Sequence, residues 1–176
     1  MLKRTPFYDF HVSMGAKLVD FAGWEMPIMY RGIIDEHVQT RQSGSIFDVS
    51  HMGRLQFGGK DATAFLNHIV TRNVAEQKVG QSRYSLVCNE SGGVMDDIIV
   101  SRDEKNWIMV CNASNRGKLV PYFHQVREKT GMAVGAPVLA QEMKSGLRQR
   151  DIAVLIAFAS LDMEQHAGTV DLRDTE

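Results

Sequence analysis

The chain has 176 residues, of which 44% are hydrophobic and 23% charged, and its formal net charge is -1. This length accommodates an ordinary domain with a hydrophobic core, and the near-neutral charge provides no attraction to nucleic acid or to an anionic membrane. The longest late apolar run, residues 152–161, is much shorter than the roughly 20 residues that span a bilayer. The N-terminus lacks the apolar stretch of a secretory signal, so we expect a cytoplasmic protein with no nucleic-acid or membrane partner.

Helical and strand patterns alternate along the chain. Residues 33–43 and 61–70 show the spacing of apolar positions that is typical of helices, and Asp61 suits the N-cap of the second. From residue 82 onward, RYSLVCN, VMDDIIVSR and WIMVCNA predict three strands joined by short loops, which indicates an antiparallel meander. The segment 115–131 then predicts a helix that ends at Gly131 and covers the sheet. The expected fold class is α+β, with a largely antiparallel sheet covered by helices.

The cysteines and one short polar segment bear on redox and metal chemistry. Cys88 and Cys111 lie in apolar runs, which favours buried reduced thiols over a disulfide or a metal pair. Asp48 and His51 lie close together in FDVSHMG, but two candidate ligands without a third are more typical of a polar turn. We therefore expect no metal site.

Two adjacent carboxylates, Asp96 and Asp97, interrupt the apolar strand pattern GGVMDDIIV. Side chains alternate along a strand, so the two point to opposite faces and at most one serves a given pocket. Apolar residues on both faces predict a strand that is buried on both sides. Burial among Ile and Met would raise the pKa of such a carboxylate and suit it to share a proton with a ligand nitrogen. A structural alternative, an aspartate bonded to turn amides, fits the pattern equally well.

Four blocks of sequence carry a family resemblance: TPFYDFHVSMGAKLVDFAGWEMPIMY, IFDVSHMG, RYSLVCNESGGVMDDIIV and WIMVCNASN. In order and spacing they resemble the aminomethyltransferase family, the T protein of the glycine cleavage system. The resemblance covers residues 1–131, which we interpret as a folate-binding region. Residues 132–176 diverge and lack the family's Gln-Gly-Pro turn, so the chain resembles a truncated, N-terminal portion of the family fold.

The resemblance implies a reaction and its partners. Family members move an aminomethyl group from the lipoylated H protein to tetrahydrofolate, which is the one-carbon acceptor, releasing ammonia and forming 5,10-methylenetetrahydrofolate. Asp97 matches the family's acid/base aspartate, and Asn112 matches an asparagine that hydrogen-bonds the folate. Residues that match other pocket positions are Met52, Leu55, Tyr84 and Val110. The segments that hold the folate tail in the family have no counterpart that aligns here.

Two other functions remain open at this stage. The chain could be a non-catalytic, truncated folate-binding remnant, or it could resemble the folate domain of a dimethylglycine- or sarcosine-oxidising enzyme. The block KLVDFAGWEMPIMY followed by FDVSHMG favours the aminomethyltransferase. The strand-like apolar runs MAVGAPVLA and DIAVLIAFA lead us to expect self-association through the C-terminal segment, because an unpaired strand exposes its edge.

Overall fold

The computed structural model describes residues 1–135, 138–139 and 154–157. The chain divides into two compact units, with the boundary between His51 and Met52. The first unit contains the N-terminal segment and strand β9 (Val154–Ala157), and the second contains the segment from Met52 through strand β8 (Val138–Leu139). Each unit has its own secondary structure.

The first unit combines two short helices with two pairs of antiparallel strands. Strands β1 and β2 form a hairpin whose two turn residues, Ala22 and Gly23, both have positive φ (53° and 82°), as a two-residue turn of this type requires. The third strand of the unit pairs with β9. The elements in chain order are α1 (Tyr8–Ser13), β1 (Lys17–Phe21), β2 (Trp24–Met29), α2 (Ile33–Gln42) and β3 (Ser45–Asp48). The helix predicted over residues 33–43 is therefore confirmed as α2.

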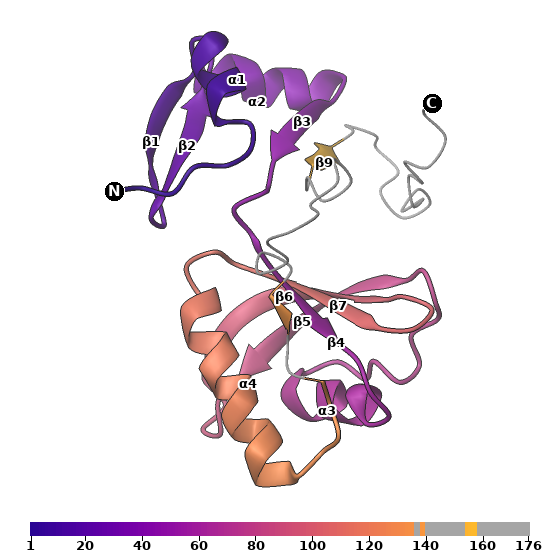
Figure 1. The fold of residues 1–176 in the computed structure, drawn as a ribbon. Helices are drawn as coiled ribbons and strands as arrows, with labels where there is room; N and C mark the ends of the chain where they lie inside the picture. Colours follow the sequence, from indigo (N-terminus) through magenta and orange to yellow (C-terminus); the bar gives the residue numbers. More distant parts are fainter. Residues whose placement is uncertain (136–137, 140–153, 158–176) are drawn as a thin grey trace. The chain divides into compact units, whose positions relative to one another are not determined.

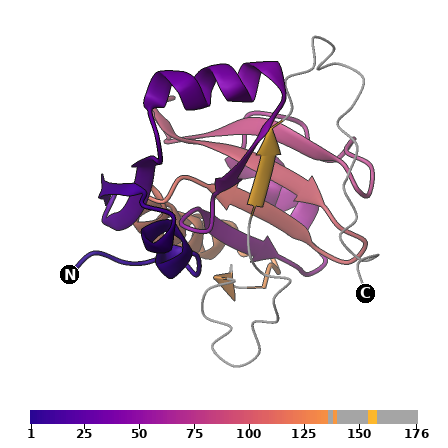
Figure 2. The same cartoon turned by 90° about the horizontal axis from the view of Figure 1, so that it is seen from above.

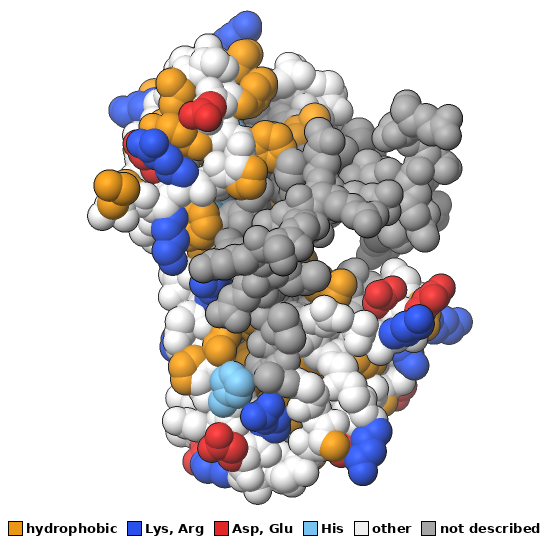
Figure 3. Space-filling view, viewed as in Figure 1, with side chains coloured by type: hydrophobic (Ala, Val, Ile, Leu, Met, Phe, Trp, Pro, Cys, Tyr) orange, Lys and Arg blue, Asp and Glu red, His pale blue; other side chains and the backbone are white. Residues whose placement is uncertain are grey.

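Large hydrophobic side chains remain exposed on the first unit. Figure 3 shows hydrophobic side chains on its surface, among Lys, Arg, Asp and Glu. The exposed members of α2 and β3 include Ile33, Ile34, Val38, Ile46 and Phe47. Helix α2 has no fully buried residue, so it contributes little to a core within this unit.

The second unit is built around a five-stranded sheet with the order β5-β6-β7-β4-β8 (Figure 1). Every neighbouring pair in this sheet is antiparallel. Its described elements are β4 (Gly53–Phe57), α3 (Ala62–Ile69), β5 (Ser82–Cys88), β6 (Val94–Arg102), β7 (Trp107–Cys111), α4 (Arg116–Thr130) and β8. The predicted meander of three strands is confirmed as β5, β6 and β7, and the predicted fold class is confirmed.

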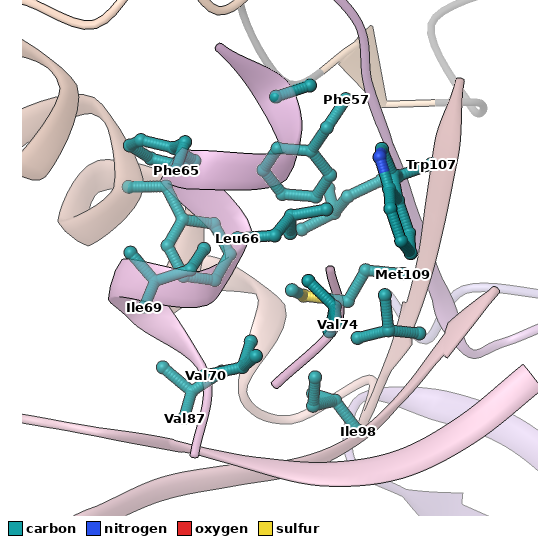
Figure 4. Packing of buried hydrophobic residues seen from close by; sticks show 14 of the residues in the cluster. Phe57, Phe65, Leu66, Ile69, Val70, Val74, Val87, Ile98, Trp107 and Met109 are labelled. Carbon is teal, nitrogen blue, oxygen red and sulfur yellow. The ribbon is translucent and has the colours of Figure 1, made fainter. Parts of the chain in front are cut away.

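The hydrophobic core of this unit lies between one face of the sheet and the helices α3 and α4. Figure 4 shows aromatic and aliphatic side chains from the helices and the strands packed against one another. Phe57 of β4 packs against Phe65 of α3 and Phe123 of α4, with ring centroids 6.0 and 5.8 Å apart. Burying each such ring contributes about 1.5–3 kcal/mol relative to leaving it exposed. These contacts fix both helices to the same face.

Helix α4 confirms the prediction made for residues 115–131. Its buried side chains, Leu119, Phe123 and Val126, are spaced three and four apart and form one stripe facing the sheet. Gly131 ends the helix with a left-handed conformation (φ 64°), which glycine adopts without steric cost. The whole apolar stripe of α4 is thus used in covering the sheet.

The opposite face of the sheet is open within the described residues, which corrects the prediction that the β6 strand is buried on both sides. Ile99 is 45% exposed and Val94 is 61% exposed, whereas Ile98 and Val100 are in the core. Both helices lie on one face, because their apolar stripes pack into the same core. Figure 2, which is turned by 90° from the view of Figure 1, shows the strands of the sheet with α4 behind them.

Both cysteines are free, as predicted; Cys111 is buried and Cys88 partly buried. Among the residues that the structure describes, no helix is both long enough and apolar enough to cross a membrane.

Candidate functional site

The candidate site lies where strands β6 and β7 meet near one end of the second unit's sheet. A glycine turn leads from β5 into β6. In this turn, the side-chain oxygen of Asn89 accepts hydrogen bonds from the backbone N–H groups of Ser91 and Gly93. The register of β6 on β7 then pairs Ile98 with Cys111. Asp97 and Asn112, which adjoin this pair, are therefore brought side by side.

Asp96 and Asp97 point to opposite faces, as their spacing predicts. Asp96 is 2% exposed on the core side, whereas Asp97 is exposed on the open face. The Asp96 carboxylate accepts hydrogen bonds from the backbone N–H of Asn112 (3.0 Å), from Asn112 Nδ2 (2.9 Å) and from Asn115 Nδ2. A buried carboxylate is tolerated only when such donors replace water. Asp96 thus matches the structural alternative raised by the sequence, while Asp97 does not.

Asp97 and Asn112 form a direct polar pair. Asn112 Nδ2 donates to Asp97 Oδ1 at 2.8 Å and to the Asp97 backbone carbonyl at 3.2 Å. Asn112 is partly buried and follows the last residue of β7. Two of the residues predicted for the site are therefore in hydrogen-bonding contact.

An apolar row adjoins this polar pair on the open face. The strand register pairs Tyr84 with Ile99 and Ile99 with Val110, so the three side chains lie next to one another across β5, β6 and β7. Tyr84 is 57% exposed, and Val110 is partly buried. The tyrosine ring and the two aliphatic side chains, beside two polar side chains, can support one face of a heteroaromatic ring while its nitrogen atoms meet Asp97 and Asn112.

The remaining two predicted residues differ in position. Met52 is partly buried and precedes Gly53, which pairs with Cys111, so Met52 lies at the same end of the sheet as Asn112. Leu55 is 0% exposed and belongs to the core between the sheet and the helices. The structure therefore does not bring Leu55 to the open face, because its position in β4 alternates toward α3 and α4. Arg54, its neighbour, pairs with Val110 instead.

Asn115 was missed by the sequence reasoning. It is the N-cap residue of α4, but its side chain makes no capping hydrogen bond and donates to Asp96 instead. The only signal for it was the second asparagine of WIMVCNASN, three positions after Asn112. Cys111, between the aspartates and the helix, is affected by the same carboxylate: burial and then the negative charge of Asp96 raise the pKa of its thiol to about 11.

A second polar array, also missed, lies within the first unit. His11 is buried and its ring nitrogens contact Tyr30 Oη (Nδ1, 2.7 Å) and Asp48 Oδ2 (Nε2, 3.0 Å). Burial opposes ionisation of Asp48, but hydrogen bonds from His11 and from the Ser50 backbone outweigh it and lower the pKa of that carboxyl. Burial, with the charges of Asp48 and Glu36, raises the pKa of Tyr30. The Asp48 carboxylate is thus bound by the His11 ring and the Ser50 backbone of its own unit.

The array borders a cavity of about 580 Å³ in the first unit. Its walls are mainly β2, α2 and β3, and none of the predicted site residues lines it. In the described part of the chain, no group of three or more His, Cys, Asp or Glu side chains could hold a metal ion.

The described architecture is that of an α+β protein whose open sheet face carries an aspartate–asparagine pair beside an apolar row. Residues 7–149 match the model of the family described as the GCVT N-terminal domain, and the chain belongs to this family. The resemblance drawn from the four sequence blocks is therefore confirmed.

Named relatives and a solved structure are similar to this chain over part of their length. The aminomethyltransferase of Rubrobacter xylanophilus is 48% identical over 124 residues, which is 70% of this chain and 33% of that protein. The aminomethyltransferase of Bacillus velezensis is 36% identical over 179 residues, covering 96% of this chain and 49% of that protein. The glycine cleavage system aminomethyltransferase T of Bartonella henselae superposes with a TM-score of 0.72 at 36% identity, covering 77% of this chain and 37% of that one. The chain thus spans between about a third and a half of the length of these relatives.

Proposed function

We propose that the chain acts in aminomethyl transfer: it binds tetrahydrofolate on the open sheet face and uses Asp97 to move a proton while the folate accepts a one-carbon group. The donor is the aminomethylated lipoyl arm of the glycine cleavage H protein. We also propose that the protein acts in the cytoplasm, as expected from the sequence.

One observation carries the proposal: Asp97, Asn112, Tyr84 and Val110, predicted for folate binding from the family resemblance, lie together on one exposed sheet face. Family membership supports the same chemistry. A folate offers a flat ring for the apolar row and nitrogen atoms for the polar pair. The proposed occupancy therefore accounts for a face that combines exposed apolar side chains with a carboxylate.

The reaction requires proton movement but no redox change. The carbon of the lipoyl S–CH2–NH2 group forms bonds to N5 and N10 of tetrahydrofolate and loses its bonds to sulfur and to the amino nitrogen. The two hydrogens released by N5 and N10 end on the sulfur, as a thiol, and on the amino group, which leaves as ammonia. The Asp97 carboxylate, held by Asn112 and open to solvent, accepts a proton from one folate amine and returns it to a leaving group.

Replacement of Asp97 by asparagine tests this role. The Asp97→Asn variant keeps the size of the side chain and removes its ability to accept a proton. We expect formation of 5,10-methylenetetrahydrofolate, measured with aminomethylated H protein and tetrahydrofolate, to slow by at least about 100-fold, as is typical for the loss of a general acid–base group.

Asp103→Asn is the matched control, because Asp103 is an exposed carboxylate in the turn after β6 of the same sheet. It should leave the rate unchanged. An equal loss in both variants, or in neither, would contradict the role of Asp97. If the 176-residue chain binds tetrahydrofolate but forms no 5,10-methylenetetrahydrofolate, the catalytic proposal is refuted and a folate-binding role is favoured.

A further inference from the structure

The most enclosed charged group at the site, Asp96, has no part in the proposed proton transfer. Its side chain faces the core, and no folate atom on the open face would meet it. It nevertheless accepts three hydrogen bonds, two of them from Asn112. Burying a carboxylate is costly, so its position beside a binding residue calls for a reason other than stability.

The contacts determine which way the Asn112 amide faces. Carboxylate and carbonyl oxygens only accept hydrogen bonds, so the nitrogen end of the amide must face Asp96 and Asp97. Asn112 Nδ2 is 2.9 Å from Asp96 Oδ1, 2.8 Å from Asp97 Oδ1 and 3.2 Å from the Asp97 carbonyl. An amide nitrogen has two hydrogens, and these acceptors use both.

The atoms that remain for a ligand are acceptors. Among the residues that the structure describes, Asn112 Oδ1 and Asp97 Oδ2 receive no hydrogen bond, whereas the other polar atoms of the two side chains are engaged with each other or with Asp96. A ligand nitrogen that carries hydrogen is attracted to such a pair. A ligand nitrogen that presents a lone pair is repelled by it.

We propose that Asp96 is a positioning residue that fixes Asn112 with its carbonyl oxygen toward the ligand, so that the Asp97–Asn112 pair offers only acceptors and selects the reduced folate ring. This rests on the proposed function, which places the folate amines at Asp97. N5 carries hydrogen in tetrahydrofolate, but in oxidised folic acid it has an exposed lone pair. The polarity of the site therefore discriminates between the two oxidation states of one ligand.

The positioning role can be tested without any ligand. In the 176-residue chain, hydrogen exchange of the Asn112 side-chain amide, followed by NMR, should be at least about 10-fold slower than that of Asn89, because hydrogen bonds to two carboxylates protect it. Asn89 is exposed, and its side-chain nitrogen donates to no described residue. Equal exchange at the two residues would overturn the role of Asp96, even if no variant folds.

The selection is tested by calorimetry with tetrahydrofolate and folic acid. We expect the wild-type chain to prefer tetrahydrofolate by at least about 10-fold, since a site built to pair with N–H groups rejects an analogue that lacks them. In Asp96→Asn, the carboxylate that accepts from Asn112 Nδ2 is replaced by an amide whose nitrogen can face that atom, and only the Asp97 oxygens still hold the original orientation. A larger fraction of the Asn112 amides should therefore turn over and present their donors outward. The preference should then fall by at least about threefold, while overall folding is retained.

Asp103→Asn again serves as the control and should keep the full preference. A preference unchanged in Asp96→Asn would refute the positioning of Asn112 by Asp96. Binding of neither folate by the wild-type chain would refute the proposed function, and the selection with it, whereas the amide exchange would still decide how Asn112 is held.

Discussion

A single methyl group placed at Gly53 should disturb the junction that brings Met52 and Asn112 to the same end of the sheet. Gly53 is buried at the start of β4 and pairs with Cys111 of β7. A Cβ atom at this position would lie 2.5 Å from Cys111 Sγ and 3.1 Å from Arg116 Cδ. The arginine carbon belongs to a long side chain that can move away, whereas the Cys111 side chain is short and buried and has little room to move.

Gly53→Ala should therefore lower the free energy of unfolding by about 1–3 kcal/mol, the usual cost of overpacking a core. Cys111→Ala alone should cost about 1 kcal/mol, because it removes one buried atom and leaves a small cavity. In the double variant the new methyl group occupies the space of the lost sulfur. It should be no less stable than Cys111→Ala, which corresponds to a coupling energy of at least about 1 kcal/mol.

Urea unfolding followed by fluorescence provides the measurement. The chain has two tryptophans, and Trp107 is buried in the second unit whereas Trp24 belongs to the first. A Trp24→Phe background makes the emission of Trp107 report the unit that contains Gly53. Additive effects of the two substitutions would show that the methyl group does not meet the sulfur, and the described packing at this junction would be wrong.

Two further predictions concern ionisation. Burial lowers the pKa of His51 below its ordinary value of 6.5. The contribution of His51 to the stability of the fold should therefore be fully present above pH 6.5, near the unfolded value, and should decrease as the pH falls below it. The urea midpoints measured at pH 7.5 and 5.5 should converge in His51→Gln. The Cys111 thiol has a pKa of about 11, compared with an ordinary value of 9.0, so its thiolate fraction at pH 8 is about 100-fold smaller than that of an ordinary cysteine. Iodoacetamide should therefore modify Cys111 only after denaturation. Rapid labelling of Cys111 in the folded chain would contradict its burial.

Local patterns were sufficient for the central meander and the helices of the second unit, but not for β4 and β8. Short loops and alternating apolar residues predict β5, β6 and β7, and the spacing of Leu119, Phe123 and Val126 predicts α4. Local patterns could not predict which face of the sheet is buried and which is exposed. An apolar residue such as Ile99 has the same sequence signal whether or not a helix covers it, and only the packing of α3 and α4 on one face decides the matter.

The candidate site was predictable only in part for a related reason. Alternation along the strand separates Asp96 from Asp97, but it does not reveal that Asn112 and Asn115 both donate to Asp96, because those contacts join residues 16 and 19 positions apart. Leu55 was placed in the site by resemblance, whereas its register in β4 places it in the core. The His11 array was missed because its members are far apart in the sequence: His11 lies in α1, Tyr30 directly after β2 and Asp48 in β3.

The sheet of the second unit divides the tasks of its residues by face. Side chains such as Phe57 and Ile98 hold the helices, whereas Tyr84, Ile99 and Val110, on the opposite face of the same sheet, contribute little to that core. Substitutions in the second group should therefore leave the unfolding free energy almost unchanged. Strand alternation thus lets natural variation or laboratory selection alter what this surface recognises without first having to compensate for lost stability.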